Sequence, residues 1–225
     1  VGSENSIVIK DEIVSSYVVH SKEKALNRFI SQGAVSEASV SLSSSFIVPF
    51  ARAIGANAAH IGFLSAFSGL IAPFGNLWGS KLMERISRKH IHITYTAWMA
   101  FIWIPSIFLS FLFSRSMALP WLPYFLVLFY SLFIFFGAVK DPASFSWMGD
   151  LVPEEQRGHY FARRNRVIGW AGVVTFLVGG LVLYIFEAKP YVLGIYSVVF
   201  VVAIFLRIIS LYQVKHVFSP HFKLK

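Results

Sequence analysis

The chain has 225 residues, of which 56% are hydrophobic and 14% charged, and its formal net charge is +9. Soluble domains carry about 25% charged residues. The apolar residues here fall in blocks long enough to cross a bilayer, which takes about 20 residues per helix. This composition excludes an ordinary soluble protein and predicts an all-α polytopic membrane protein. The sequence contains no cysteine, which excludes disulfides and thiolate metal sites.

Six apolar segments follow one another along the chain, and each is a predicted membrane span. They cover about 29–50, 60–82, 91–113, a fourth segment from 122 to a point between Val139 and Trp147, about 167–186, and about 191–211. Continuous apolar runs of this length do not alternate as barrel strands must. We therefore expect a cytoplasmic segment over 1–26, a six-helix transmembrane bundle over 27–213, and a cytoplasmic tail or the start of a linker over 214–225.

Lysine and arginine are distributed unevenly among the connections, and this bias sets the orientation of membrane helices. Most of them fall in the N-terminal segment, after the second and fourth spans, and in the C-terminal tail. The opposite connections hold only Arg52, Arg115 and Lys189. We expect both termini in the cytoplasm and the protein in the cell membrane. Because the basic residues follow the topology, no nucleic-acid partner is expected.

Two short segments of the chain resemble each other. Residues 33–39 read GAVSEAS and residues 137–143 read GAVKDPA, so each has GAV, one further residue, and an acid. Each lies in the first helix of a group of three predicted helices. Weak internal similarity of this kind is typical of transporters built on inverted repeats. The pattern favours two three-helix inverted repeats.

Two further motifs resemble a known family. Residues 80–89, SKLMERISRK, are similar to the loop motif G-x-L-A-D-R-x-G-R-K of the major facilitator superfamily, with Ser80 and Ser87 in place of glycines and Glu84 in place of the aspartate. Residues 137–158 resemble the fourth helix of that family and its following Pro-x-x-x-Arg-Gly turn. The resemblance implies the N-terminal six-helix half of a secondary transporter, since family members normally have two such halves.

The charged residues of the fourth span are candidates for a buried site. Ten residues separate Lys140 from Asp150, which is expected at the cytoplasmic headgroups, so the offset along a helix is about 15 Å. The hydrocarbon core is about 30 Å thick, which places Lys140 and Asp141 near its middle. Alternatively, the hydrocarbon ends at Val139 and Lys140 lies in the interface. Pro142 indicates either a packing kink or a hinge.

The first span is unusually polar. Gly33, Glu37, Ser41 and Ser44 recur on one helical face, which we expect to point into the bundle. An intramembrane carboxylate is a candidate functional site. We therefore predict that Glu37, with Lys140, Asp141, Ser41 and Gln32, handles substrate or protons. Two structural alternatives remain: Glu37 and Lys140 simply neutralise each other, or Asp141 serves only to neutralise Lys140.

A second group of charged residues is expected at the cytoplasmic ends of the helices. The family resemblance implies that this group forms a conformational latch; its members are Glu84, Arg85, Arg88, Asp150 and Arg157. Separately, Gly75 and Gly79 form a small-xxx-small pattern on the second span. This pattern favours close helix packing, and packing is also favoured over substrate contact for Asn76.

The remaining polar residues suggest no further chemistry. Arg207 lies near the cytoplasmic end of the last span, where its side chain is expected to extend to the headgroups. His90 and His92 are expected at a membrane interface, without further ligands at metal spacing. No phosphate loop, nucleophile–base arrangement or metal motif occurs in the sequence. We therefore expect no cofactor, no metal and no enzymatic activity.

The functional prediction is a secondary active transporter of a small polar molecule, coupled to protons. Its partners are the lipid bilayer, the substrate, and either a second copy of the chain or a separate six-helix half. The alternative is a non-transporting scaffold or regulatory protein of the same fold.

Overall fold

The computed structural model describes residues 2–108, 121–186 and 192–217. Its helices are α1 Gly2–Ser44, α2 Ile47–Ala53, α3 Ala58–Leu82, α4 Arg88–Phe101, α6 Leu122–Leu151, the short 3-10 helix η1 Glu154–Gln156, α7 Arg157–Phe186 and α8 Val192–Lys215. The described residues contain no strand. Within the described residues, six helical stretches are long and apolar enough to cross a membrane. The predicted all-α architecture with six spans is therefore confirmed.

The spans differ from their predicted limits at several ends. Helix α1 begins well before residue 29, and after a turn at residues 45–46 the first span continues as α2. The third span bends after α4, at residues 102–103, and helix resumes at residues 104–108. Pro105 explains the bend, because proline has no amide proton to donate to Phe101. The predicted end of this span, at 113, and the predicted start of the sixth, at 191, lie outside the described residues.

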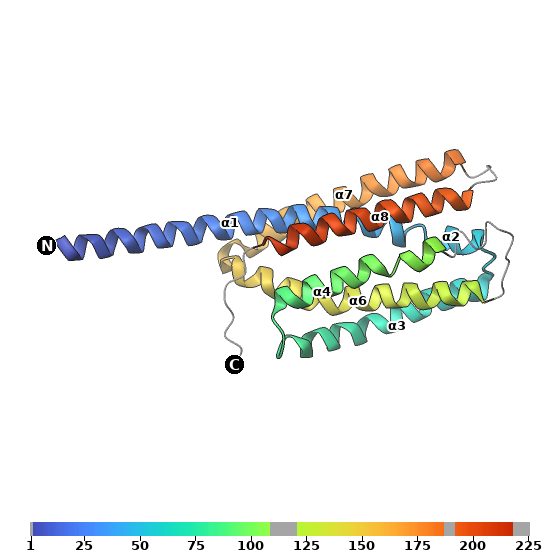
Figure 1. Cartoon of the computed structure of the whole chain (residues 1–225), viewed down its shortest axis with the longest axis horizontal. Helices are drawn as coiled ribbons and strands as arrows, with labels where there is room; N and C mark the ends of the chain where they lie inside the picture. The colour runs from blue at the N-terminus through green and yellow to red at the C-terminus, as the bar shows by residue number, and fades with distance from the viewer. Residues whose placement is uncertain (1, 109–120, 187–191, 218–225) are drawn as a thin grey trace.

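The six spans pack as two spatial groups, α1 with α7 and α8, and α6 with α3 and α4. Helix α1 packs on α7 and α8, helix α6 packs on α3 and α4, and α4 contacts α8. The first three spans correspond in order to the last three: α1 to α6, α3 to α7 and α4 to α8. If each helix is replaced by its counterpart, the same set of contacts results. Figure 1 shows that α1 and α6 run in opposite directions, with α7 and α8 beside α1 and with α3 and α4 beside α6. The two predicted three-helix inverted repeats are thus confirmed.

Glycines allow the closest contacts between helices of the two repeats. A Cβ atom at Gly79 would lie 2.2 Å from the carbonyl oxygen of Val139, and one at Gly75 would lie 2.7 Å from Ala138 Cβ. On α7, a Cβ at Gly179 would lie 2.6 Å from the ring of Phe46. Helix α3 therefore lies against α6 as α7 lies against α1, with glycine at each closest approach.

Three apolar clusters form among the described buried residues, and the two largest lie toward opposite ends of the bundle. The larger contains Trp103, whose ring stacks on Phe200 at 5.1 Å, and Phe50, whose ring lies 5.0 Å from Phe200. The smaller contains Phe29 and Trp147, which meet edge to face at 4.8 Å. Along each of the helices α1, α4, α6 and α8, polar residues lie between these clusters. The charged residues of the chain's interior are therefore enclosed between two apolar layers.

Large apolar side chains cover the outer surface of α3 and α7. Leu70 and Phe74 on α3, and Trp170 and Leu177 on α7, are each more than half exposed. A soluble protein rarely exposes so continuous an apolar surface, whereas a lipid-facing helix requires one. The exposed surface agrees with the six spans in identifying an integral membrane protein.

Candidate functional site

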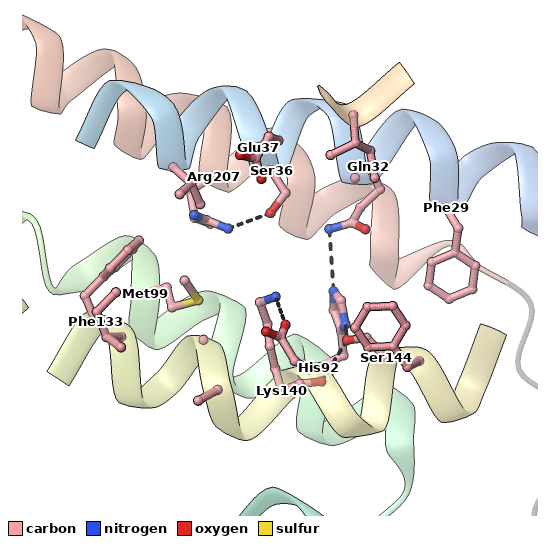
Figure 2. A pocket seen from close by; sticks show the side chains of 18 of the residues that line it. Phe29, Gln32, Ser36, Glu37, His92, Met99, Phe133, Lys140, Ser144 and Arg207 are labelled. Carbon is pink, nitrogen blue, oxygen red and sulfur yellow. Dashed lines mark hydrogen bonds and ion pairs between the residues drawn. The ribbon is translucent and has the colours of Figure 1, made fainter. Parts of the chain in front are cut away.

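A cavity of about 450 Å³ lies in the middle of the bundle, and all six spans contribute to its lining. In Figure 2, side chains from α1 and α8 face side chains from α4 and α6 across it. Four of the five predicted coupling residues line the cavity: Gln32, Glu37, Lys140 and Asp141. The fifth, Ser41, is buried beside Gly172 of α7, where an added Cβ would lie 3.3 Å from the serine oxygen.

Lys140 lies inside a continuous helix rather than at the end of one. Helix α6 continues through Pro142 to Leu151, and the Lys140 side chain is only 14% exposed. Its ammonium Nζ lies 2.9 Å from Asp141 Oδ1. This ion pair matches one of the two structural alternatives, the one in which Asp141 neutralises Lys140.

Glu37 lines the same cavity without joining that pair. Among the described residues, its carboxylate forms no ion pair and accepts no hydrogen bond. Gly172 leaves room for it, because a Cβ there would lie 3.2 Å from Glu37 Cγ. The other structural alternative, an ion pair between Glu37 and Lys140, is therefore absent among the described residues. Glu37 instead interacts electrostatically with Arg164 and Arg207.

Arg207 does not extend to the headgroups, and that expectation was wrong. Its side chain is 1% exposed, and Nη1 donates a hydrogen bond to Ser36 Oγ at 2.7 Å. Its guanidinium lies over the ring of Phe133, 5.8 Å from the centroid. The sequence contained an indication of this: Ala203, Arg207 and Ser210 recur at helical spacing and so share one face of α8. All three residues are buried in the structure.

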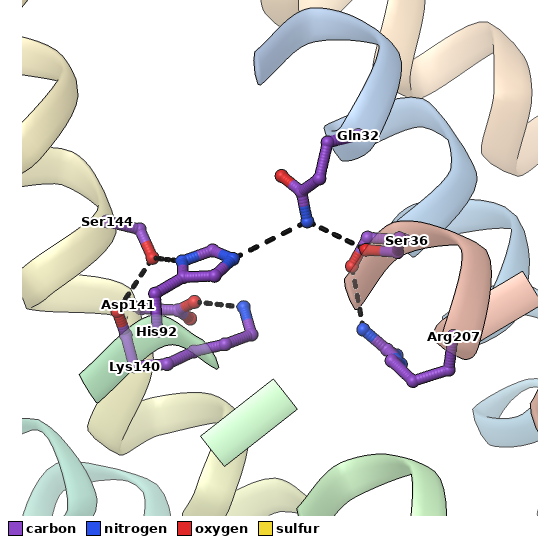
Figure 3. A network of polar contacts seen from close by, with 8 residues as sticks. Gln32, Ser36, His92, Lys140, Asp141, Ser144 and Arg207 are labelled. Carbon is purple, nitrogen blue, oxygen red and sulfur yellow. Dashed lines mark hydrogen bonds and ion pairs between the residues drawn. The ribbon is translucent and has the colours of Figure 1, made fainter. Parts of the chain in front are cut away.

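His92 is also buried, contrary to its predicted place at an interface. It belongs to a chain of hydrogen bonds, and Figure 3 shows its members Gln32, His92, Ser144 and Lys140. Gln32 Nε2 donates to Ser210 Oγ at 2.8 Å and lies 3.5 Å from His92 Nε2. His92 Nδ1 contacts Ser144 Oγ, which donates to the carbonyl of Lys140 at 2.8 Å.

The hydrogen-bond partners in this chain are compatible with one neutral tautomer of His92. An amide nitrogen only donates, so His92 Nε2 accepts from Gln32. The single hydroxyl proton of Ser144 is used on the Lys140 carbonyl, so His92 Nδ1 carries the proton that Ser144 accepts. The imidazole is neutral in this arrangement. The network joins α1 and α8 of one group of helices to α4 and α6 of the other.

Arg164 lines the cavity, although the sequence placed it in the connection between the fourth and fifth predicted spans. Helix α7 begins at Arg157, so Arg164 lies two turns inside it and lines the cavity. Its guanidinium carbon lies 5.7 Å from the centroid of the Phe145 ring. The apolar run that marked the fifth span began later, at residue 167, and so hid this contribution.

The predicted latch residues fall into two sets. Arg88, at the start of α4, forms an ion pair with Asp150, near the end of α6. Arg157 donates to the carbonyls of Gly149 and Val152, at 3.1 and 3.4 Å, and so satisfies acceptors at the C-terminus of α6. Glu84 and Arg85 instead border a separate cavity of about 330 Å³.

Inverted helix repeats around a polar cavity are the architecture of secondary transporters, and this chain has both the repeats and a polar cavity in the middle of the bundle. Its sequence matches the family model of the Major Facilitator Superfamily over residues 30–223. The chain therefore belongs to this superfamily, a family of transporters and not of enzymes, as its motifs predicted. Neither a curated protein nor a solved structure shows a significant match to the chain.

Proposed function

We propose that this chain carries a small polar molecule through the cavity between α1 and α6 and couples its movement to protons. The observation that supports this most is Glu37, a carboxylate in the cavity that forms no ion pair or hydrogen bond among the described residues. A group without a fixed partner is available to bind and release a proton or a substrate. Intramembrane carboxylates commonly have this role.

The transporting unit is proposed to contain a second bundle. Alternating access requires two bundles that rock about a central site, and a lone six-helix bundle has no second bundle to rock against. A second copy, or a separate six-helix half, would cover spans one, two, four and five. Cross-linking in native membranes should capture this partner, and recovery of monomers alone would contradict it.

The orientation proposed from the basic residues puts both termini in the cytoplasm. The start of α1 and the end of α8 lie at the same end of the bundle (Figure 1). This end also holds the ion pair between Arg88 and Asp150. An impermeant thiol reagent added outside intact cells should fail to label a Glu84→Cys variant; labelling would reverse the orientation.

Flux measurements in proteoliposomes test the proposed function. The purified full chain is reconstituted, and uptake is measured for a panel of neutral, anionic, cationic and zwitterionic solutes, with and without a pH gradient. We expect saturable uptake of at least one solute, accelerated by the gradient. Folded protein that moves none of them would instead favour a non-transporting scaffold or regulatory protein.

A further inference from the structure

We propose that the cavity contains a binding site for the carboxylate group of a small organic acid, centred on Arg207. This inference rests on the proposed transport function, because it names the class of substrate that the same cavity takes. It depends on three features of the structure: the free edge of the Arg207 guanidinium, the balance of charge around it, and the apolar lining beside it.

The first feature is the part of Arg207 that has no partner. Nη1 is bonded to Ser36, but Nε and Nη2 are buried and have no hydrogen-bond partner among the described residues. These two nitrogens form one edge of the guanidinium, and that edge binds both oxygens of a carboxylate side-on. A buried donor left unpaired is costly. Arg207 lines the cavity, so a carboxylate bound there would relieve the cost of this unpaired edge.

The second feature is the charge of the lining. Three basic side chains, Lys140, Arg164 and Arg207, face the cavity with two carboxylates, Glu37 and Asp141. Asp141 is already paired with Lys140. Both carboxylates interact electrostatically with Arg207 and Arg164, yet neither forms an ion pair with them in the described structure. The basic excess matches one negative charge on a ligand.

A second arginine adds to this excess. Arg164 also lines the cavity, and its Nε is buried without a partner among the described residues. Its Nη1 donates to Asn165 at 3.3 Å, so the side chain is only partly satisfied by the protein. A ligand carboxylate bound at Arg207 would therefore experience a second positive charge from α7.

The third feature is the apolar lining, which distinguishes an organic acid from an inorganic anion. Phe133 lies under the Arg207 guanidinium, and other apolar side chains complete the wall: Phe29, Val40, Met99, Ile134 and Ile168. A cavity of about 450 Å³ is within the range of small-molecule sites. A polar anchor within apolar walls suits a carboxylate attached to a hydrocarbon body.

Thermal stabilisation of the full chain in detergent tests this site with defined probes. The panel contains benzoate and lactate, their neutral amides benzamide and lactamide, and inorganic phosphate. At least one carboxylate should raise the melting temperature saturably, and its amide should not. Arg207→Gln should weaken the apparent affinity about tenfold to 100-fold, as expected for loss of a charge-assisted hydrogen-bonded pair.

Three further variants control for misfolding and for general charge effects. Arg207→Lys keeps the charge but loses the planar fork, so it should also weaken binding if Arg207→Gln does not fold. Arg163→Gln removes an exposed arginine of α7 that does not line the cavity, and it should bind as the unaltered chain does. Arg164→Gln should weaken binding less than Arg207→Gln.

The outcomes separate this inference from the transport proposal. No carboxylate-specific stabilisation, stabilisation by phosphate alone, or stabilisation unchanged in Arg207→Gln and Arg207→Lys would overturn the carboxylate site. Arginine-dependent binding without flux in proteoliposomes would support the site and contradict transport. Flux of a neutral solute that does not depend on Arg207 would support transport and overturn the site.

Discussion

Replacing Glu37 with glutamine is expected to reduce pH-driven uptake by about tenfold or more while the chain remains folded. Glutamine has nearly the shape of glutamate but cannot exchange a proton near neutral pH. A hydrogen bond to a charged group is typically worth about 1.5–3 kcal/mol, which corresponds to tenfold or more in binding or rate. Initial uptake rates in proteoliposomes, with and without a pH gradient, give the measurement.

The same variant distinguishes a functional from a structural carboxylate. Among the described residues Glu37 forms no ion pair or hydrogen bond, so the substitution removes no such contact, and stability should change by less than about 1 kcal/mol. Glu155→Gln, at an exposed carboxylate of η1, is the control and should keep full uptake. If Glu37→Gln loses stability in proportion to uptake, Glu37 is structural.

Replacing Gly79 with alanine is expected to cost about 1–3 kcal/mol of stability, the usual range for overpacking. The added Cβ would lie 2.2 Å from the Val139 carbonyl oxygen and 2.9 Å from its carbon. Both are backbone atoms, so no rotamer change can relieve the clash, and α3 must move away from α6. Thermal unfolding in detergent, followed by tryptophan fluorescence, measures the loss.

Gly69 provides the matched control on the same helix. A Cβ at this position meets nothing within 4 Å, so Gly69→Ala should leave stability unchanged or raise it slightly, since alanine is the better helix former. Equal melting temperatures for the two variants would show that α3 does not approach α6 as closely as the structure places it.

The spans, the repeats and the closest helix contact were predictable, because each depends on a pattern that is visible in the sequence. The six spans follow from apolar runs of membrane length, and the inverted repeats from the shared GAV-x-acid pattern. Gly75 and Gly79 lie where α3 meets α6, at the place where the small-xxx-small pattern indicated close packing. These features depend on the periodicity of one helix or the similarity of two, and both are visible in the chain itself.

The composition of the cavity was only partly predictable, because it depends on how helices are rotated against one another. Lys140 and Glu37 both line it, but the choice of Asp141 as the partner of Lys140 depends on side-chain reach. Arg207 and His92 lie near the ends of their predicted spans, where headgroup contact was the simpler expectation. Only the packing of α8 and α4 against other helices turns them inward.

Accessibility of the cavity from both sides of the membrane tests the central claim most directly. The chain contains no cysteine, so Asn76→Cys would introduce a single thiol into the cavity lining, and Leu70→Cys an exposed control on the same helix outside it. In oriented membrane vesicles, an impermeant maleimide should label Asn76→Cys when added to either side and should leave Leu70→Cys unlabelled. Labelling of Asn76→Cys from one side only would contradict alternating access.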